Sequence, residues 1–259
     1  MKYILKIEIN CYIIINHIMW DYRNFEINWG ILMLLPYDKL PDNMKNDKVK
    51  PYYDLLCKKR KSLFLKRLTD LFIGIILLII LIIPMIIICV IVKLTSKGHV
   101  LYKQQRVTTY GKKFNIFKFR TMVEGADKIG ALVTSKDDCR VTKIGKVLRK
   151  YRLDELPQIF HVLSGKMSIV GTRPEVPKYV EKYTDEMYAT LLMPAGITSL
   201  ASIKFKDEEK LLENSDNIDK DYVEKILPQK MRYNLKYINR FGFRRDVHLM
   251  LKTIKEVVS

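Results

Sequence analysis

The feature that most limits how this chain can fold is an uncharged apolar run, LFIGIILLIILIIPMIIICVIV, at positions 71–92. A helix of about 20 apolar residues is long enough to cross the hydrocarbon core of a bilayer. Basic residues precede the run, and Lys93 and Lys97 follow it. The sequence therefore predicts that residues 58–97 form one unit, a basic flank followed by a membrane-inserted helix.

Pro84 lies near the middle of this run. A proline removes one helical hydrogen bond and clashes with the preceding turn, so it can break the helix. Basic residues favour the cytoplasmic side, which places residues 58–67 there. A straight span would send residues 98–259, which are also strongly basic, to the opposite side. Two topologies stay open from the pattern: a re-entrant helix-break-helix with both flanks on one face, and an ordinary span that tolerates its proline.

The net charge of the chain is +18, from 46 Lys and Arg against 28 Asp and Glu. Such an excess predicts an anionic partner: nucleic acid, an acidic membrane surface or a phosphorylated substrate. The four cysteines and four histidines show no spacing typical of metal ligands. This argues against a zinc site and against histidine catalysis.

Outside the apolar run, the pattern predicts a mostly helical α+β domain over residues 98–259. Alternating apolar residues at 100–106 and 114–121, around TTYGKK, predict a short β-hairpin. Lys146, Arg149 and Lys150 share one face at helical spacing, which predicts a helix over residues 143–152. Apolar periodicity predicts helices over residues 176–192 and 244–258. The last two are amphipathic; the tyrosines of the 176–192 helix favour a membrane interface, and core packing is an equal alternative for the 244–258 helix.

Residues 1–57 differ in composition from the rest and are predicted to be a poorly structured lead-in, flexible over 34–52. Met33 is an alternative start of the protein.

In the predicted hairpin, the cations Lys118 and Arg120 share one strand face with Phe114 and Ile116. These cations either point toward a ligand or protect an edge strand from aggregation.

The stretch YRLDELPQ places two adjacent carboxylates, Asp154 and Glu155, among basic residues and just before Pro157. Proline is tolerated in the first turn of a helix, so a helix is expected to begin at or just after Asp154. Asp154 is then a candidate N-cap, which is the purely structural interpretation. A helix N-terminus surrounded by basic side chains also favours a bound anion.

Two neighbouring carboxylates repel each other, so one is expected to keep its proton at higher pH than usual. One of the pair can then act as a nucleophile or metal ligand while the other handles protons. A magnesium ion (or manganese) held by Asp154 and Glu155 would complete a site for a diphosphate. In GTRPE at 171–175, Arg173 can grip a phosphate with two hydrogen bonds.

These residues belong to a series of motifs in which the chain resembles the bacterial sugar transferases, the monotopic polyprenyl-phosphate phosphoglycosyl transferases, in their small form. The resemblance covers about residues 62–259. The motifs that carry it are LKRLTD, Pro84, YKQQR, FNIFKFRTM, RVTKIGKVLR, LDELPQ, GKMSIVGTRPE and PAGIT.

The resemblance implies a membrane helix that is re-entrant at Pro84 and a catalytic domain on the cytoplasmic face of the bacterial inner membrane. It implies that Asp154 is the nucleophile and a Mg²⁺ ligand, with Glu155 as its partner in metal binding or proton transfer. Arg149 is implied to hold phosphate. The further implied positions are Lys118, Arg120 and Arg173 near the substrates, and Gln158 behind the pair.

The activity that the resemblance implies is transfer of a sugar-1-phosphate from a UDP-sugar to undecaprenyl phosphate, through a covalent aspartyl intermediate. This would be the first membrane step in making an exopolysaccharide, capsule or O-antigen-type glycan. Expected partners are the two substrates and membrane lipids, with no nucleic acid; a homodimer is left open. The chain departs from the family pattern at Thr108, His161, Lys166 and Thr172, and after PAGIT, so the sugar is not predicted.

Two other functions stay open from the sequence. A membrane-anchored basic module that binds anionic lipid or nucleic acid would explain the charge and the anchor, but not the carboxylate pair. A glycosyl transferase that moves the sugar without its phosphate would release UDP rather than UMP.

Overall fold

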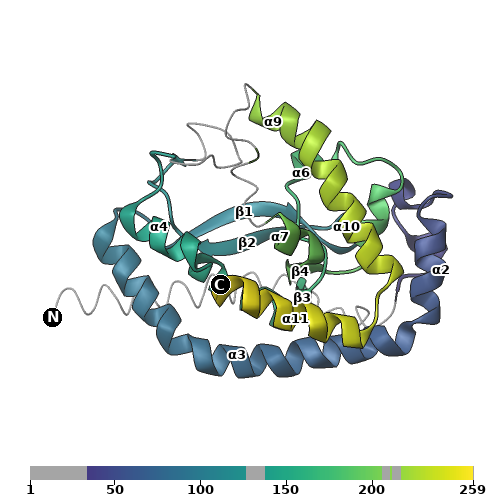
Figure 1. The fold of residues 1–259 in the computed structure, drawn as a ribbon, viewed down its shortest axis with the longest axis horizontal. Coiled ribbons are helices and arrows are strands. Elements are labelled where there is room, and N and C mark those ends of the chain that lie inside the picture. Colours follow the sequence, from purple (N-terminus) through teal and green to yellow (C-terminus); the bar gives the residue numbers. More distant parts are fainter. Residues whose placement is uncertain (1–33, 127–137, 206–210, 212–216, 259) are drawn as a thin grey trace.

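The computed structural model describes residues 34–126, 138–205, 211 and 217–258, and Figure 1 shows their arrangement. The α-helices are α2 (Lys50–Lys58), α3 (Arg60–Thr95), α4 (Lys143–Lys150), α5 (Ile159–Leu163), α6 (Pro177–Val180), α7 (Leu200–Lys204), α9 (Ile218–Asp221), α10 (Leu227–Asn239) and α11 (Phe243–Val258). The strands are β1 (Leu101–Val107), β2 (Lys113–Phe119), β3 (Met167–Val170) and β4 (Ala195–Thr198). The fold is therefore α+β and mostly helical, as predicted.

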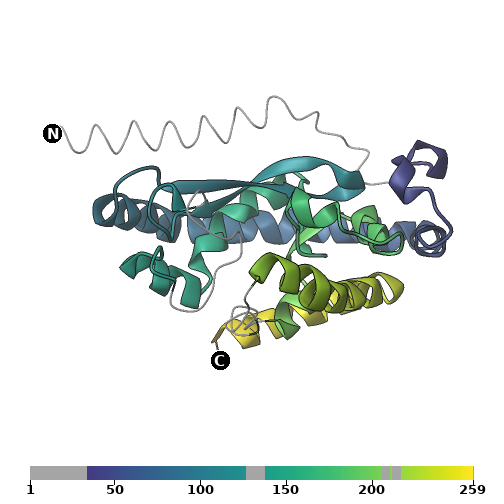
Figure 2. The same ribbon diagram turned by 90° about the horizontal axis from the view of Figure 1, so that it is seen from above.

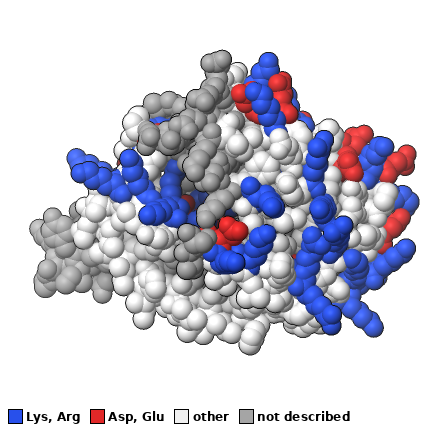
Figure 3. Space-filling model, viewed as in Figure 1, with Lys and Arg blue, Asp and Glu red and all other residues white. Residues whose placement is uncertain are grey.

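Helix α3 contains the whole apolar run and is one continuous helix of 36 residues, with Pro84 inside it. Its most apolar window of 18 residues has a mean hydropathy of 3.8, and only 17% of that window is buried. Large side chains such as Phe72, Ile79 and Ile83 are about two-thirds exposed. The middle of the lower edge in Figure 3, along which α3 runs, carries no charged side chains, whereas cations gather at its right-hand end. A helix of this length and composition can anchor the protein in a membrane.

One narrow face of α3 packs against the rest of the protein. In Figure 1 the helix curves along one side of the molecule, and its largest contact is with α5. Gly74 allows this approach, because a side chain at that position would meet the Leu163 side chain of α5 at 2.9 Å. Met85, Ile88 and Val92 are buried in the second half of α3, so helix and domain share one core.

Polar contacts tie both ends of α3 to the same domain. Near its start, Lys66 makes a buried ion pair of 2.7 Å with Asp246 of α11. Asp70 accepts hydrogen bonds from the Ser168 hydroxyl at 2.6 Å and from the Ile169 amide at 3.1 Å. At its far end, the Ser96 carbonyl and hydroxyl accept hydrogen bonds from Arg120.

The two small sheets are of different kinds. Strands β1 and β2 form the predicted antiparallel hairpin, with Leu101 opposite Phe119 and Val107 opposite Lys113. Strands β3 and β4 are parallel, so they need the long crossover that α6 and the 3₁₀ helix Met187–Leu192 provide. Figure 2 shows the hairpin on one side of the molecule and helices α10 and α11 on the other.

Two predicted helices have the expected positions. Helix α4 occupies most of the interval predicted over 143–152, and α11 matches the interval predicted over 244–258. On α11, Leu251 and Ile254 are 63% and 61% exposed, so the apolar stripe of this helix is not wholly used in the core.

The prediction of one helix over residues 176–192 is wrong. The chain forms only α6 and the 3₁₀ helix Met187–Leu192 there, separated by six residues. Tyr179, Leu191 and Leu192 are buried, because they face the core rather than a membrane interface. The apolar residues at helical spacing therefore belong to two short helical turns, which pack separately against the core.

The part of the lead-in that the structure describes is folded, in contrast to the prediction for residues 1–57. Met44, Val49 and Leu56 are fully buried, and α2 packs against α10. The Tyr52 hydroxyl donates a hydrogen bond of 2.6 Å to Glu186. Apolar residues scattered in a polar segment were enough to bury it, since α10 offers a surface for them. The alternative start at Met33 lies outside the described residues.

Candidate active site

The carboxylate pair lies on a tight turn between α4 and α5. Arg152 adopts the left-handed conformation, with φ of 54°, and reverses the chain after α4. A 3₁₀ helix, Leu153–Gln158, follows and contains Pro157. The N-cap of that helix is Arg152, so the prediction that Asp154 is an N-cap is wrong. Asp154 does not cap the helix, because it is the second residue inside it.

Glu155 is held by two cations from distant parts of the chain. Lys118 of β2 donates a hydrogen bond of 2.8 Å to the Glu155 Oε1 atom, and Arg173 binds both carboxylate oxygens. Burial alone raises the pKa of Glu155, but the charges of Arg173 and Lys118 outweigh it and hold that pKa well below the usual value. Glu155 is therefore an ionised, immobilised anion.

Asp154 is buried to a similar degree, with 8% of the residue exposed, yet no described residue makes a hydrogen bond or ion pair with its carboxylate. Burial raises the pKa of Asp154; the positive charge of Lys118 opposes this, and the negative charge of Glu155 adds to it. The sequence predicted unequal pKa values from repulsion within the pair. The structure gives burial as the larger cause and repulsion as a smaller one.

Arg149 lies on the last turn of α4, close enough to lower the pKa of Asp154 by its charge. Its Nε atom donates a hydrogen bond of 2.9 Å to the Thr121 hydroxyl, just after β2. Thr142 caps the start of α4, where its hydroxyl accepts a hydrogen bond of 3.0 Å from the Gly145 amide. The helix thus brings one cation to the side of Asp154.

Two glycines let the chain pack closely just before Arg173: Gly171 directly follows β3, and Gly196 lies within β4. A side chain on Gly171 would meet the Pro194 carbonyl at 2.5 Å, and one on Gly196 would meet the Gly171 nitrogen at 2.1 Å. Only glycine permits this approach of the GTRPE and PAGIT segments. The approach fixes where the chain leaves β3, two residues before Arg173.

Neither Arg120 nor Gln158 makes a side-chain hydrogen bond or ion pair with Asp154 or Glu155 in the described chain. Arg120 hydrogen bonds to Ser96 at the end of α3, and its Nε and Nη1 atoms have no partner in the described chain. Gln158 is 1% exposed, and its Nε2 atom likewise has no partner among the described residues. Pro84, which was predicted to break the membrane helix, lies inside the continuous helix α3.

Sequence reasoning did not assign a role to His161, which the structure places against Phe117, the residue before Lys118. Its Nε2 atom accepts a hydrogen bond of 3.2 Å from the Phe117 amide, and its ring stacks on Phe117 at 4.9 Å. Burial, with a smaller effect of Lys166, lowers the pKa of His161 to about 3, so the ring is neutral and can accept this bond. No sequence signal links residues 44 positions apart.

Fold and site together define an α+β protein whose carboxylate pair lies among arginines and a lysine, beside a helix long enough to anchor it in a membrane. Residues 61–259 match the family model described as "Bacterial sugar transferase", and the chain belongs to that family.

Several known proteins are similar to this chain. An Aeromonas hydrophila protein named UDP-N-acetylgalactosamine-undecaprenyl-phosphate N-acetylgalactosaminephosphotransferase is 33% identical, over 76% of this chain and 44% of its own length. A Klebsiella pneumoniae UDP-glucose:undecaprenyl-phosphate glucose-1-phosphate transferase is 35% identical, over 74% and 40%. The chain thus spans less than half the length of these two. The Bacillus subtilis uncharacterized sugar transferase EpsL is 32% identical, over 76% and 88%.

Proposed function

We propose that this protein transfers a sugar-1-phosphate from a UDP-sugar to undecaprenyl phosphate and releases UMP, through a covalent intermediate on Asp154. The observation that carries the proposal is the buried carboxylate of Asp154, which has no partner in the described chain, beside a Glu155 held by two cations. The names of the relatives support the substrates, since they are undecaprenyl-phosphate sugar phosphotransferases.

The chemistry asks a carboxylate to approach a negatively charged diphosphate. An oxygen of Asp154 would bond to the phosphorus that carries the sugar, while the bond to the bridging oxygen breaks and UMP departs with its electron pair. The phosphate oxygen of undecaprenyl phosphate would then displace Asp154 from the same phosphorus. Arg149, Lys118 and Arg173 supply positive charge around both anions, which lowers their repulsion in the transition state.

The carboxylates also fit a magnesium (or manganese) ion, which typically binds through one or two carboxylates and the phosphates of a substrate. Asp154 would be the main protein ligand, because Glu155 is already occupied by Lys118 and Arg173. No group of three His, Cys, Asp or Glu residues able to hold a metal occurs in the described chain. Substrate phosphates would therefore complete the ligand set. A bound ion would neutralise part of the diphosphate's charge.

We further propose that α3 is re-entrant and that the domain lies on the cytoplasmic face of the inner membrane, where UDP-sugars are made. Its support is that both ends of α3 bind the same domain: Lys66 pairs with Asp246, and Ser96 accepts hydrogen bonds from Arg120. Cysteines introduced at each flank should react with a membrane-impermeant reagent from the same side in oriented vesicles. Reaction from opposite sides would disprove re-entry.

The activity is tested with purified membranes, a panel of UDP-sugars and undecaprenyl phosphate, with UMP as the measured product. Release of UMP with one sugar would identify the donor and place the protein at the first membrane step of a surface glycan. Release of UDP would point instead to a glycosyl transferase. Salt-sensitive binding to anionic lipid without turnover of any donor would favour a basic binding module.

A further inference from the structure

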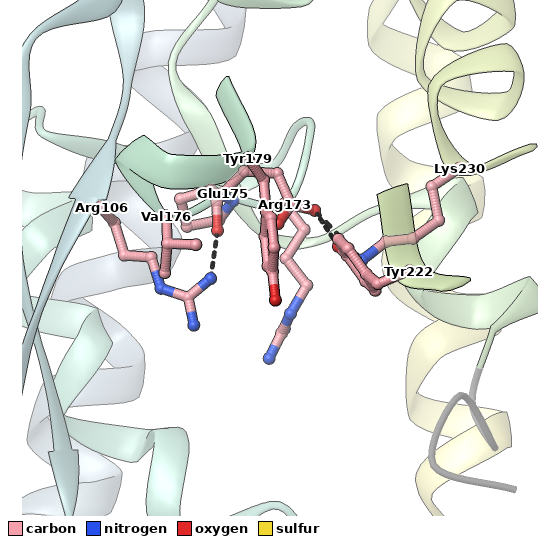
Figure 4. Close-up of a pocket in the computed structure, with 8 residues that line it drawn as sticks. Arg106, Arg173, Glu175, Val176, Tyr179, Tyr222 and Lys230 are labelled. Carbon is pink, nitrogen blue, oxygen red and sulfur yellow. Dashed lines mark hydrogen bonds and ion pairs between the residues drawn. The ribbon is translucent and has the colours of Figure 1, made fainter. Parts of the chain in front are cut away.

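A small pocket lies beside the carboxylate pair, on the far side of Arg173. Figure 4 shows the side chains that surround it, contributed by β1, by the segment after β3 and by the start of α10 with the preceding π-helix. The lining residues are Arg106, Arg173, Pro174, Glu175, Val176, Tyr179, Tyr222 and Lys230. The cavity measures about 60 Å³, room for a group the size of a few water molecules, such as a phosphate.

On one wall, the charges of Lys230 and Glu175 satisfy each other. The two side chains form a buried ion pair of 3.1 Å. The Tyr222 hydroxyl donates a hydrogen bond of 2.8 Å to Glu175 and accepts one of 2.7 Å from Lys230. The charges of Lys230 and Arg106, and the Tyr222 hydrogen bond, overcome the effect of burial and lower the pKa of Glu175. This wall is a closed, neutral unit that shapes the pocket.

On the opposite wall, Arg106 has a different environment. Its guanidinium donates to two neutral acceptors, the Gln104 amide oxygen at 2.6 Å and the Pro174 carbonyl at 3.0 Å. No carboxylate of the described chain lies within ion-pair distance of Arg106. Burial lowers the pKa of Arg106, although the charge of Glu175 opposes this. A partly buried cation without a direct counter-ion is costly, and an anionic ligand would offset that cost.

Arg173 joins this pocket to the carboxylate pair. Its guanidinium contacts Glu155 and also lines the pocket, and Figure 4 shows Arg173 and Arg106 extending toward the same space. An anion between the two arginines would therefore lie next to a group bound at Asp154. A diphosphate has this shape, with two linked phosphates that need two adjacent cationic sites.

We propose that Arg106, together with Arg173, binds the phosphate that leaves with the nucleoside. This inference rests on the proposed function and adds a residue to it. When the bond between the sugar-bearing phosphorus and the bridging oxygen breaks, that oxygen keeps the electron pair and gives the nucleotide phosphate an additional negative charge. Arg106 stabilises this charge, so it promotes departure of UMP rather than attack by Asp154.

The test measures binding of UMP and of uridine to the full-length protein in nanodiscs by calorimetry. We expect Arg106→Gln to weaken UMP binding at least about tenfold, because a hydrogen-bonded charge pair is lost, and to leave uridine binding unchanged. Arg106→Lys should give a smaller loss. Lys112→Gln, an equal change of charge on the exposed hairpin turn, should have no effect. Wild-type affinity for UMP in a folded Arg106→Gln protein would overturn the inference.

A measurement on the unaltered protein covers the case in which the variants do not fold. Hydrogen–deuterium exchange should slow in residues 104–108 and 173–179 when UMP is added, and not when uridine is added. Equal exchange with and without UMP would overturn the inference. Because neither measurement needs turnover, a failure of the proposed function is seen separately, as absence of UMP release from any UDP-sugar.

Discussion

Two regions of the molecule bury opposite charges, and they do so differently. At the junction of α3 and α11, every charge has a partner: Lys66 binds Asp246 and the Val170 carbonyl, and Asp246 also accepts a hydrogen bond from Tyr237. At the carboxylate pair, Glu155 is fully engaged, but Asp154 has no partner in the described chain. A closed network holds two elements together, whereas an incomplete one leaves a group able to react.

The difference explains why similar burial has opposite meanings in the two places. Burial raises the pKa of Asp246, as it does for Asp154. At the junction, however, Lys66 and Tyr237 supply hydrogen bonds that compensate. The junction therefore contributes to stability, and the site gives up stability to keep Asp154 available.

The largest effect is expected from Asp154→Asn, which keeps the shape of the side chain and removes its negative charge. UMP release should fall at least about a thousandfold, because the nucleophile is lost. The matched control is Asp185→Asn on the surface, which should retain normal activity. Unchanged turnover in Asp154→Asn would exclude Asp154 as nucleophile and remove the contrast between the two regions.

The junction is tested by Lys66→Met, which leaves Asp246 buried without its cation. We expect the free energy of unfolding to fall by about 3–5 kcal/mol, measured by thermal or denaturant unfolding in detergent. Asp54→Ala breaks the exposed pair with Lys50 and should cost no more than about 0.5 kcal/mol. If the free energy of unfolding falls by the same small amount in both variants, the buried ion pair at the junction does not stabilise the fold.

A third variant, Glu155→Gln, sharpens the electrostatic account of the pair. Asp154 reacts as a carboxylate, so activity should decline on the acid side at a pH above its ordinary pKa of 3.8. Removing the charge of Glu155 and freeing Lys118 and Arg173 both lower the pKa of Asp154. The acid limb of the residual activity should move to lower pH. A limb that stays in place would mean that another group controls it.

The smallest effect concerns the stability of Asp154→Asn. Because the folded-state pKa of Asp154 is raised, ionising it costs the folded state energy that the unfolded chain does not lose. Asp154→Asn should therefore have a higher Tm than the wild type at neutral pH. The gap should close as the pH falls through the folded-state pKa toward 3.8. A lower Tm at neutral pH would show that the carboxylate stabilises the fold.

Local sequence signals predicted the elements whose packing is simple. The hairpin and helices α4 and α11 follow from short periodic patterns and turn residues that act over a few positions. The helix predicted over 176–192 fails because a helical spacing of apolar residues cannot show whether one helix or two separate turns bury them. The prediction of a poorly structured lead-in is wrong for its described part for a similar reason, since the fold of that part depends on contacts with α10.

For this protein, the sequence alone determined that an apolar helix precedes an α+β domain and that a carboxylate pair lies among cations. Those properties depend on residues that are neighbours in the chain. Only the tertiary structure decided which carboxylate is free, because Lys118 and Arg173 reach Glu155 from β2 and from the end of β3. It also decided that Arg120 binds Ser96 rather than the pair, and that Arg106 faces a pocket beside the pair. These contacts depend on burial and on distances between remote segments, and the local spacing of residues predicts neither.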